Sequence, residues 1–94
     1  MRPTAKLFSR KTNAKREAFE AEAMPHLESL YLAARRLTRS ETEADDLVQD
    51  TMLKAYRFFD RFEPGTNMRA WLLKIQTNSY INRYRRRLRE RAFR

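Results

Sequence analysis

Cysteine is absent from the 94-residue sequence, glycine occurs once and proline three times. Without cysteine the chain can form neither a disulfide framework nor a zinc finger, which is consistent with a reducing compartment such as the cytoplasm. A many-stranded β fold needs frequent tight turns, and so few glycines and prolines offer little opportunity for them. The longest apolar run covers residues 30–34, far short of the roughly 20 residues that span a bilayer. The sequence therefore predicts one helical domain without a membrane segment.

The formal net charge is +9, and the charges are distributed unevenly along the chain. Residues 1–16 carry six basic side chains and no acidic one, and residues 83–94 carry seven arginines against a single glutamate. Residues 17–82 hold eight basic and eleven acidic side chains, so the middle of the chain is acidic. Two surfaces of opposite sign indicate two different partners, one of them a polyanion.

Helical periodicity begins near residue 16. The first fifteen residues show no sustained apolar period, which predicts a flexible basic tail over residues 1–15. A short leading helix around Phe19 is interrupted near Pro25. The next apolar stripe, spaced as on one face of a helix, consists of Leu27, Leu30, Tyr31, Ala34 and Leu37. Residues 16–94 are therefore predicted to form one helical domain.

Two longer helices follow this stripe. Ser40 and Glu43 fit a capping box at the start of the first, whose predicted buried face is Ala44, Leu47, Val48, Thr51, Ala55, Phe58, Phe59 and Phe62. Residues 63–67 give a strong loop signal, after which Thr66 or Asn67 can cap the last helix. That helix has a predicted buried stripe at Met68, Trp71, Leu72, Ile75 and Ser79, and a second apolar cluster at Ile81, Tyr84 and Leu88. Short connections favour an all-α fold, a three-helix antiparallel bundle with a short leading helix.

One side of the acidic middle helix combines polar residues with a leucine. Asp46, Gln49, Asp50 and Leu53 are spaced so that they share a side turned away from the predicted core face. A solvated acidic face is the simpler explanation for the charges. A leucine within the polar patch favours instead a protein-binding surface of modest size. The spacing alone leaves both explanations open.

The loop over residues 62–67 joins two well-formed helices. It can be an ordinary turn. Alternatively, its stiff Pro-Gly bend, the polar residues Thr66 and Asn67 and the aromatic ring of Phe62 could hold an unstacked nucleotide. Phe62 could equally well belong to the hydrophobic core.

The last helix is rich in asparagine and arginine towards its end. Asn78 and Asn82 are one turn apart and share a face, although asparagine is a weak helix former. Asparagine amides can pair with base edges, and arginine can bind phosphates or guanine. Alternatively, Asn78 caps a neighbouring element and the arginines only raise solubility. Seven arginines within residues 83–94 exceed what solubility requires, which favours nucleic-acid binding.

Other candidate sites are weaker. Trp71 shares the apolar stripe of the last helix and is predicted to pack in the core. His26 is the only histidine and there is no cysteine, so no metal site is predicted. The sequence contains no evident nucleophile–base pair or glycine-rich phosphate loop, so neither an enzyme nor a cofactor is expected. The apolar face of residues 80–94 is too thin for a membrane-surface helix.

Taken together, these segments resemble region 2 of the extracytoplasmic-function (ECF) sigma factors. The resemblance covers about residues 19–87 and depends on five short segments in a fixed order. They are Ala-Asp-Asp-Leu-Val-Gln-Asp-Thr at residues 44–51, Lys-Ala-Tyr at 54–56, Asp-Arg-Phe at 60–62, Ala-Trp-Leu at 70–72 and Asn-x-x-x-Asn-Arg-Tyr-Arg-Arg-Arg at 78–87. Each segment is weak alone, whereas their order and spacing are specific.

The resemblance implies a role for each of three surfaces. The acidic helix would bind the β′ clamp helices of RNA polymerase through Asp46, Gln49, Asp50 and Leu53. The loop would capture a flipped base of the promoter minus-ten element with Phe62, Glu63, Pro64, Gly65, Thr66 and Asn67, with Lys54 nearby. The last helix would contact mainly single-stranded promoter DNA through Arg69, Lys74, Asn78, Asn82, Arg83, Arg85 and Arg86. Because ECF members lack the aromatic pair with which primary sigma factors melt DNA, opening would depend on trapping one base and on polymerase itself.

The expected function is therefore minus-ten recognition and opening in bacterial transcription initiation. The helix-turn-helix domain of the family, region 4, is expected to be absent, which leaves an excised domain, a fragment or a stand-alone protein open. The rival function is a sigma-like module that sequesters an anti-sigma factor without productive promoter recognition. Anti-sigma factors commonly cover these surfaces in the family, so the resemblance implies such a partner in either case.

Overall fold

The computed structural model describes residues 3–92, and their side chains from residue 12 onwards. Four α-helices and two 3₁₀ turns follow one another: α1 Pro3–Ala23, η1 Met24–His26, α2 Leu27–Thr38, α3 Glu41–Arg57, η2 Phe59–Arg61 and α4 Met68–Ala92. No strand occurs between residues 3 and 92, and no helix in that range combines the length and hydropathy that a membrane span requires. The predicted all-α fold is confirmed.

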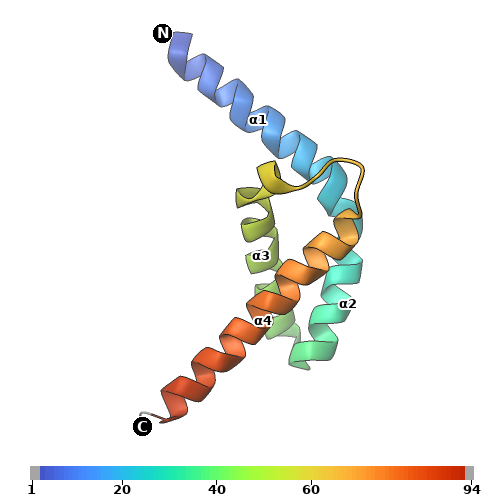
Figure 1. Cartoon of the computed structure of the whole chain (residues 1–94), viewed down its shortest axis with the longest axis vertical. Helices are drawn as coiled ribbons and strands as arrows, with labels where there is room; N and C mark the ends of the chain where they lie inside the picture. Colours follow the sequence, from blue (N-terminus) through green and yellow to red (C-terminus); the bar gives the residue numbers. More distant parts are fainter. Residues whose placement is uncertain (1–2, 93–94) are drawn as a thin grey trace.

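Helices α2, α3 and α4 form the bundle, and successive helices run in opposite directions (Figure 1). Helix α4 crosses the α2–α3 pair obliquely, and its C-terminal part extends beyond the bundle at the end opposite the chain's N-terminus (Figure 1). The predicted antiparallel three-helix arrangement is therefore correct. Because only the first half of α4 lies over both partner helices, its second half is left to contact α3 or other molecules.

The leading helix α1 is longer than the sequence predicted. It starts at Pro3 and gives residues 3–15 helical backbone, where a tail without regular structure was expected. Proline is compatible with a first helical turn, and the segment that follows contains no glycine and several good helix formers. Of its side chains from residue 12 onwards, Phe19 and Ala23, near its end, are buried. The flexibility of residues 1–15 and a domain boundary at residue 16 stay predictions.

The core lies between the three bundle helices and is closed by the end of α1. Leu30, Leu47 and Leu72, one from each bundle helix, are fully buried. Gln76, a polar residue absent from the predicted stripe, is 1% exposed, and its Nε2 donates to the Leu30 carbonyl at 2.9 Å. This hydrogen bond links α4 to α2, whereas the buried Gln76 Oε1 has no hydrogen-bond partner among the described residues.

The predicted buried faces are correct in most positions and wrong in a few. Phe58 was assigned to the core but is 38% exposed, because α3 ends at Arg57 and the chain turns there into η2. Phe59, Trp71 and Ile75 are half-buried beside the core rather than within it. The side chains of the second apolar cluster of α4 remain exposed, although Arg83 and Arg87 of the same segment contact α3: Ile81, Tyr84 and Leu88.

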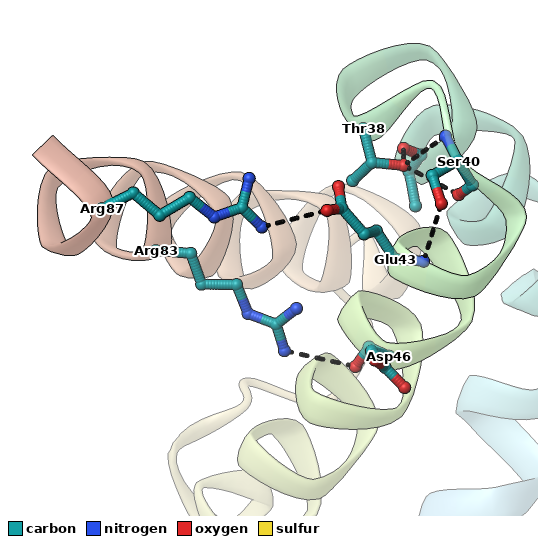
Figure 2. Close-up of polar contacts among 7 residues, drawn as sticks. Thr38, Ser40, Glu43, Asp46, Arg83 and Arg87 are labelled. Carbon is teal, nitrogen blue, oxygen red and sulfur yellow. Dashed lines mark hydrogen bonds and ion pairs between the residues drawn. The ribbon is translucent and has the colours of Figure 1, made fainter. Parts of the chain in front are cut away.

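The start of α3 uses half of the predicted capping box. The Ser40 hydroxyl accepts a hydrogen bond from the Glu43 N–H at 3.3 Å. The Glu43 carboxylate does not return to the Ser40 N–H; it contacts Arg87 at 3.4 Å instead, and the Ser40 N–H donates to the Thr38 hydroxyl (Figure 2). A side chain expected to complete a local cap thus links α3 to α4.

The loop before α4 is stabilised by its own hydrogen bonds. The Thr66 hydroxyl and N–H both donate to the Glu63 carbonyl, at 2.6 and 3.2 Å. Gly65 has a φ of 84°, a conformation that side-chain-bearing residues rarely adopt. Asn67 Oδ1 accepts the Ala70 N–H at 3.0 Å, so Asn67 rather than Thr66 caps α4. The bend is exposed and internally braced.

Candidate nucleic-acid interface and acidic helix

The acidic side of α3 has the geometry that the spacing predicted. Asp46 and Gln49 are exposed, Asp50 is half-buried and Leu53 is 71% exposed, and all four lie on one side of the helix. A leucine this exposed on a helix contributes little to the core, which leaves it available to a partner. The four residues therefore form one continuous surface, called here the acidic surface.

An apolar hollow of about 480 Å³ adjoins the acidic surface and is shared between α1 and α3. Gln49 and Leu53 line it together with residues that the sequence did not single out as a surface: Arg16, Phe19, Glu20, Met24, Leu27, Val48, Met52 and Tyr56. The contribution of α1 could not be predicted, because it depends on how α1 crosses α3. The hollow extends the acidic surface into a site with an apolar floor.

Two arginines of α4 reach back to α3 (Figure 2). Arg83 Nη2 lies 3.7 Å from Asp50 Oδ2 and donates to the Asp46 carbonyl at 3.4 Å. Arg87, one turn further on, pairs with Glu43. On this side of α4, the predicted strand-binding helix, the acidic side chains of α3 therefore partly neutralise the positive charge.

Lys54 belongs to the same network. Its Nζ lies 3.2 Å from Asp50 Oδ2 and donates to the Ser79 hydroxyl at 3.0 Å. Lys54 was expected near a captured base, but in the structure its ammonium group is held between α3 and α4. Its direct use in binding DNA would require these contacts to exchange.

The opposite side of α4 presents a line of nitrogen-bearing side chains. Lys74, Asn78, Asn82 and Arg85 follow one another at intervals of three or four residues, so they share one face of the helix, and all four are exposed. Arg69 and Arg86 are also exposed but lie outside this line, and Arg69, eighteen residues before Arg87, is on the same side of the helix as Arg87. In the described part of the chain, no carboxylate forms an ion pair with Lys74, Arg85, Arg69 or Arg86. We call Lys74, Asn78, Asn82 and Arg85 the outward line.

The loop residues divide into exposed and buried members. The residues of the bend, 63–67, are exposed. The Phe62 ring is 7% exposed and packs against Phe59 and Trp71, with ring centroids 6.2 and 5.1 Å away. Of the two alternatives for Phe62, the structure has the ring in the core. An aromatic surface for a nucleotide must then come from another residue.

A second hollow, of about 280 Å³, lies where the end of α3 and η2 meet α4. It is lined by Phe58, Arg61, Trp71, Lys74, Ile75 and Asn78. The sequence did not indicate that Phe58 and Arg61 line a hollow. The signal was available for one of them: Phe58 and Phe59 are adjacent, and adjacent residues on a helix do not face the same way. Asn78 thus belongs both to this hollow and to the outward line.

A family model described as sigma-70 region 2 matches residues 23–90. The ECF RNA polymerase sigma factor EcfG of Rhodopseudomonas palustris is 41% identical over 68 residues, which cover 72% of this chain and 36% of that protein. The RNA polymerase sigma factor CnrH of Cupriavidus metallidurans is 36% identical over 88 residues, or 93% and 46% of the two chains.

Among solved structures, the chain is similar to the sigma factor RpoE of Bartonella quintana, crystallised in complex with the anti-sigma factor NepR. The TM-score is 0.73 at 39% identity, and the match covers 79% of this chain and 46% of that one. The chain therefore spans less than half the length of these three relatives.

Proposed function

The chain belongs to the sigma-70 region 2 family and is similar to its ECF members, and we propose that it recognises the single-stranded promoter minus-ten element while bound to RNA polymerase. In this role it takes part in opening the promoter during transcription initiation. Two surfaces carry the proposal: the outward line of α4 for DNA and the acidic surface of α3 for polymerase.

The observation on which the proposal mainly depends is the outward line. Asn78 and Asn82 are exposed on one face, between the cations Lys74 and Arg85. Amide side chains can form paired hydrogen bonds with base edges, whereas lysine and arginine bind phosphates without regard to sequence. Two amides flanked by two cations along one helix suit a strand whose bases are read at the centre and whose phosphates are bound at both ends.

The bend supports the capture of one extruded base. It is exposed, braced by the hydrogen bonds of Thr66 and lies directly before α4. A protein that binds an unstacked base must offset the free energy lost when the base leaves its stack. A rigid loop helps, because little conformational entropy of the loop is lost on binding. Because Asn67 is used as the helix cap, the bend would contribute Glu63, Pro64, Gly65 and Thr66.

The acidic surface supports docking on the β′ clamp helices. Asp46, Gln49 and Asp50 supply polar contacts around the exposed Leu53, and the adjacent hollow of about 480 Å³ supplies an apolar floor. Protein interfaces combine an apolar centre with a polar rim in this way. The ion pair between Asp50 and Arg83 is exposed enough to exchange for an intermolecular one at little cost.

A second candidate function is binding of an anti-sigma factor without productive promoter recognition. One observation favours it: the similar RpoE structure contains the anti-sigma factor NepR. The apolar hollow between α1 and α3 would also suit a helix of such a partner.

Binding of single-stranded DNA at moderate salt separates the two functions. The 94-residue chain is titrated with a fluorescent strand of promoter-like sequence and with a scrambled strand of equal composition. Promoter recognition predicts a clear preference for the promoter-like strand, lost in Asn78→Ala and retained in Thr77→Ala, an exposed neighbour outside the outward line. Equal affinity of the unaltered chain for both strands would exclude recognition and favour the anti-sigma function.

A further inference from the structure

The part of α4 that carries Asn78 and Asn82 buries polar side chains rather than apolar ones. We infer that Gln76 is a positioning residue: its hydrogen bond to the Leu30 carbonyl sets the rotation of α4 on α2 and so keeps Asn78 directed at the strand. The inference rests on the proposed function, because it explains how the outward line is presented to DNA. It gives Gln76 a role that neither the sequence pattern nor the family resemblance assigned.

Burial along α4 changes in kind after Leu72. Met68 and Leu72, near the start of the helix, are its buried apolar side chains. The buried side chains after them, Gln76 and Ser79, are both polar, and no apolar side chain between residues 73 and 92 is buried. Three later apolar side chains border the core and are half-buried: Leu73, Ile75 and Tyr80. Apolar burial therefore fixes the start of α4 more firmly than the part that would read DNA.

The polar contacts of this part reach both partner helices. Gln76 Nε2 donates to the Leu30 carbonyl of α2 at 2.9 Å. Three residues further on, the Ser79 hydroxyl accepts a hydrogen bond from Lys54 Nζ of α3 at 3.0 Å. Hydrogen bonds are directional, whereas apolar contacts are not. Two bonds to different helices therefore restrain both the rotation of α4 about its axis and its sliding along the bundle.

Gln76 is the more important of the two anchors. The α3 side of α4 has further polar contacts, from Arg83 and Arg87 (Figure 2). Between residues 12 and 92, the bond from Gln76 to Leu30 is the one hydrogen bond that joins α4 to α2, and no ion pair joins these two helices. Its loss would leave α4 without a directional contact to α2.

The direction of Asn78 follows from that of Gln76. The two residues are two positions apart, and successive residues of an α-helix are about 100° apart, so the two side chains point about 200° apart. When Gln76 is turned to α2 and buried, Asn78 is turned to solvent, as observed. Any rotation of α4 that broke the bond to Leu30 would turn Asn78 by the same angle.

Stability does not account for a glutamine at this place. Gln76 is 1% exposed, and its Oε1 has no hydrogen-bond partner among the described residues. An unpaired buried acceptor loses its hydration without compensation, which offsets the gain from the Nε2 bond. The Leu30 carbonyl lies within α2 and would keep its intrahelical bond if the amide were absent. What the amide adds is a preference for one arrangement, since other packings would leave it wholly unpaired.

Gln76→Met tests the role, because methionine is also unbranched and of similar length but lacks the amide. The denaturant midpoint of unfolding should equal or exceed that of the unaltered chain. The preference for the promoter-like strand over the scrambled strand should fall about fivefold or more, the lower end of what one paired base contact contributes. Affinity for the scrambled strand should stay within about twofold, because the cations of α4 still bind phosphates.

Thr51→Val is the matched control. Thr51 is fully buried, and its hydroxyl donates to the Leu47 carbonyl at 2.8 Å, within α3. The variant therefore removes a buried polar group from the same bundle without breaking a bond between helices. It should retain the strand preference, whatever its effect on the unfolding midpoint.

The orientation of α4 can be measured without DNA. The chain contains no cysteine, so spin labels can be attached through Leu32→Cys on α2 and Arg89→Cys on α4, two exposed positions. Double electron–electron resonance should give one narrow distance distribution for this labelled pair. Adding Gln76→Met should broaden or shift the distribution, and adding Thr51→Val should leave it unchanged.

Three outcomes overturn the inference. If Gln76→Met keeps the strand preference, the positioning role is wrong and the proposed function stands. If Gln76→Met and Thr51→Val lose the preference equally and both unfold earlier, Gln76 acts through stability and not through position. If the label distances ignore Gln76→Met, Gln76 does not orient α4. Equal affinity of the unaltered chain for both strands removes the proposed function, and the label distances then still decide whether Gln76 orients α4.

Discussion

Arg83 of α4 lies with its guanidinium Nη2 3.7 Å from the carboxylate Oδ2 of Asp50 on α3. The contact joins a residue expected on promoter DNA to a residue expected on polymerase. Lys54 contacts the same carboxylate oxygen from within α3, so Asp50 is held by two cations. The two predicted interfaces are therefore connected by direct contacts between side chains, and a change in one can alter the charge presented by the other.

The strength of this contact can be measured with a double-mutant cycle. We expect Arg83→Ala and Asp50→Ala to show a coupling of about 0.2–1 kcal/mol in the free energy of unfolding, because the pair is partly exposed. The coupling should shrink as salt is added. Arg85 forms no ion pair with α3, so Arg85→Ala combined with Asp50→Ala is the control and should be additive. Equal coupling in both cycles would contradict the structural role of Arg83.

Sequence preference and overall affinity should respond to different residues of α4. Asn78→Ala should cost about 1–3 kcal/mol of binding free energy on preferred strands and little on scrambled ones, because an amide contacts base edges. Arg86→Ala should weaken binding to every strand alike and lower the slope of log affinity against log salt by about 0.7, the value for one phosphate contact on a single strand. Affinities measured over a salt series test both. A uniform loss for both variants would remove the readout role of Asn78.

Two leucines of α3 should separate polymerase docking from folding. Leu53 is 71% exposed, so Leu53→Ala should leave the free energy of unfolding within about 0.5 kcal/mol. If it lies at the centre of the polymerase interface, the same change should weaken binding to RNA polymerase core by more than about fivefold. Leu47 is fully buried, and Leu47→Ala should cost about 2–5 kcal/mol of stability.

Leu32→Ala on α2 is the matched control for docking, since Leu32 is also an exposed helical leucine. It should change neither stability nor polymerase binding. Normal polymerase binding by Leu53→Ala would show that polymerase does not bind the chain at Leu53.

The cap of α3 offers a test of the local structure. Ser40→Ala should lower the free energy of unfolding by about 0.5–2 kcal/mol, because the Glu43 N–H loses its acceptor. Glu43→Ala should cost less, since its carboxylate makes only the exposed contact with Arg87. Thermal or denaturant unfolding of both variants gives the comparison, with Thr42→Ala as the neighbouring control. A larger loss in Glu43→Ala would indicate a complete capping box in solution.

Local patterns in the sequence were sufficient to predict the bundle. The apolar stripe from Leu27 to Leu37 predicted α2, and the capping residue Ser40 predicted the start of α3. The turn-forming residues 63–67 predicted the break before α4. These features depend on residues within one helix turn of one another, where spacing translates directly into geometry. The start of α1 was missed because residues 3–15 favour helical backbone without carrying an apolar period.

The candidate site was predictable only where exposure follows from helical phase. Asn78, Asn82 and Leu53 met that condition, and they are exposed as expected. Gln76 did not, because its partner is the Leu30 carbonyl, 46 residues away in sequence. Arg83 likewise acquires its contacts, and Lys54 its hydrogen bond to Ser79, only when α4 is packed on α3. Phe58 was misassigned because α3 ends one residue before it, a boundary that periodicity does not locate.

The most direct test of the account is a selection of bound single-stranded oligonucleotides from a random pool, sequenced for the unaltered chain and for Asn78→Ala in parallel. We predict that the unaltered chain enriches one short motif, and that Asn78→Ala enriches the same motif with the preference lost at a single position. Enrichment of no motif by the unaltered chain, or of an identical motif by both proteins, would contradict the claim that the outward line of α4 reads DNA.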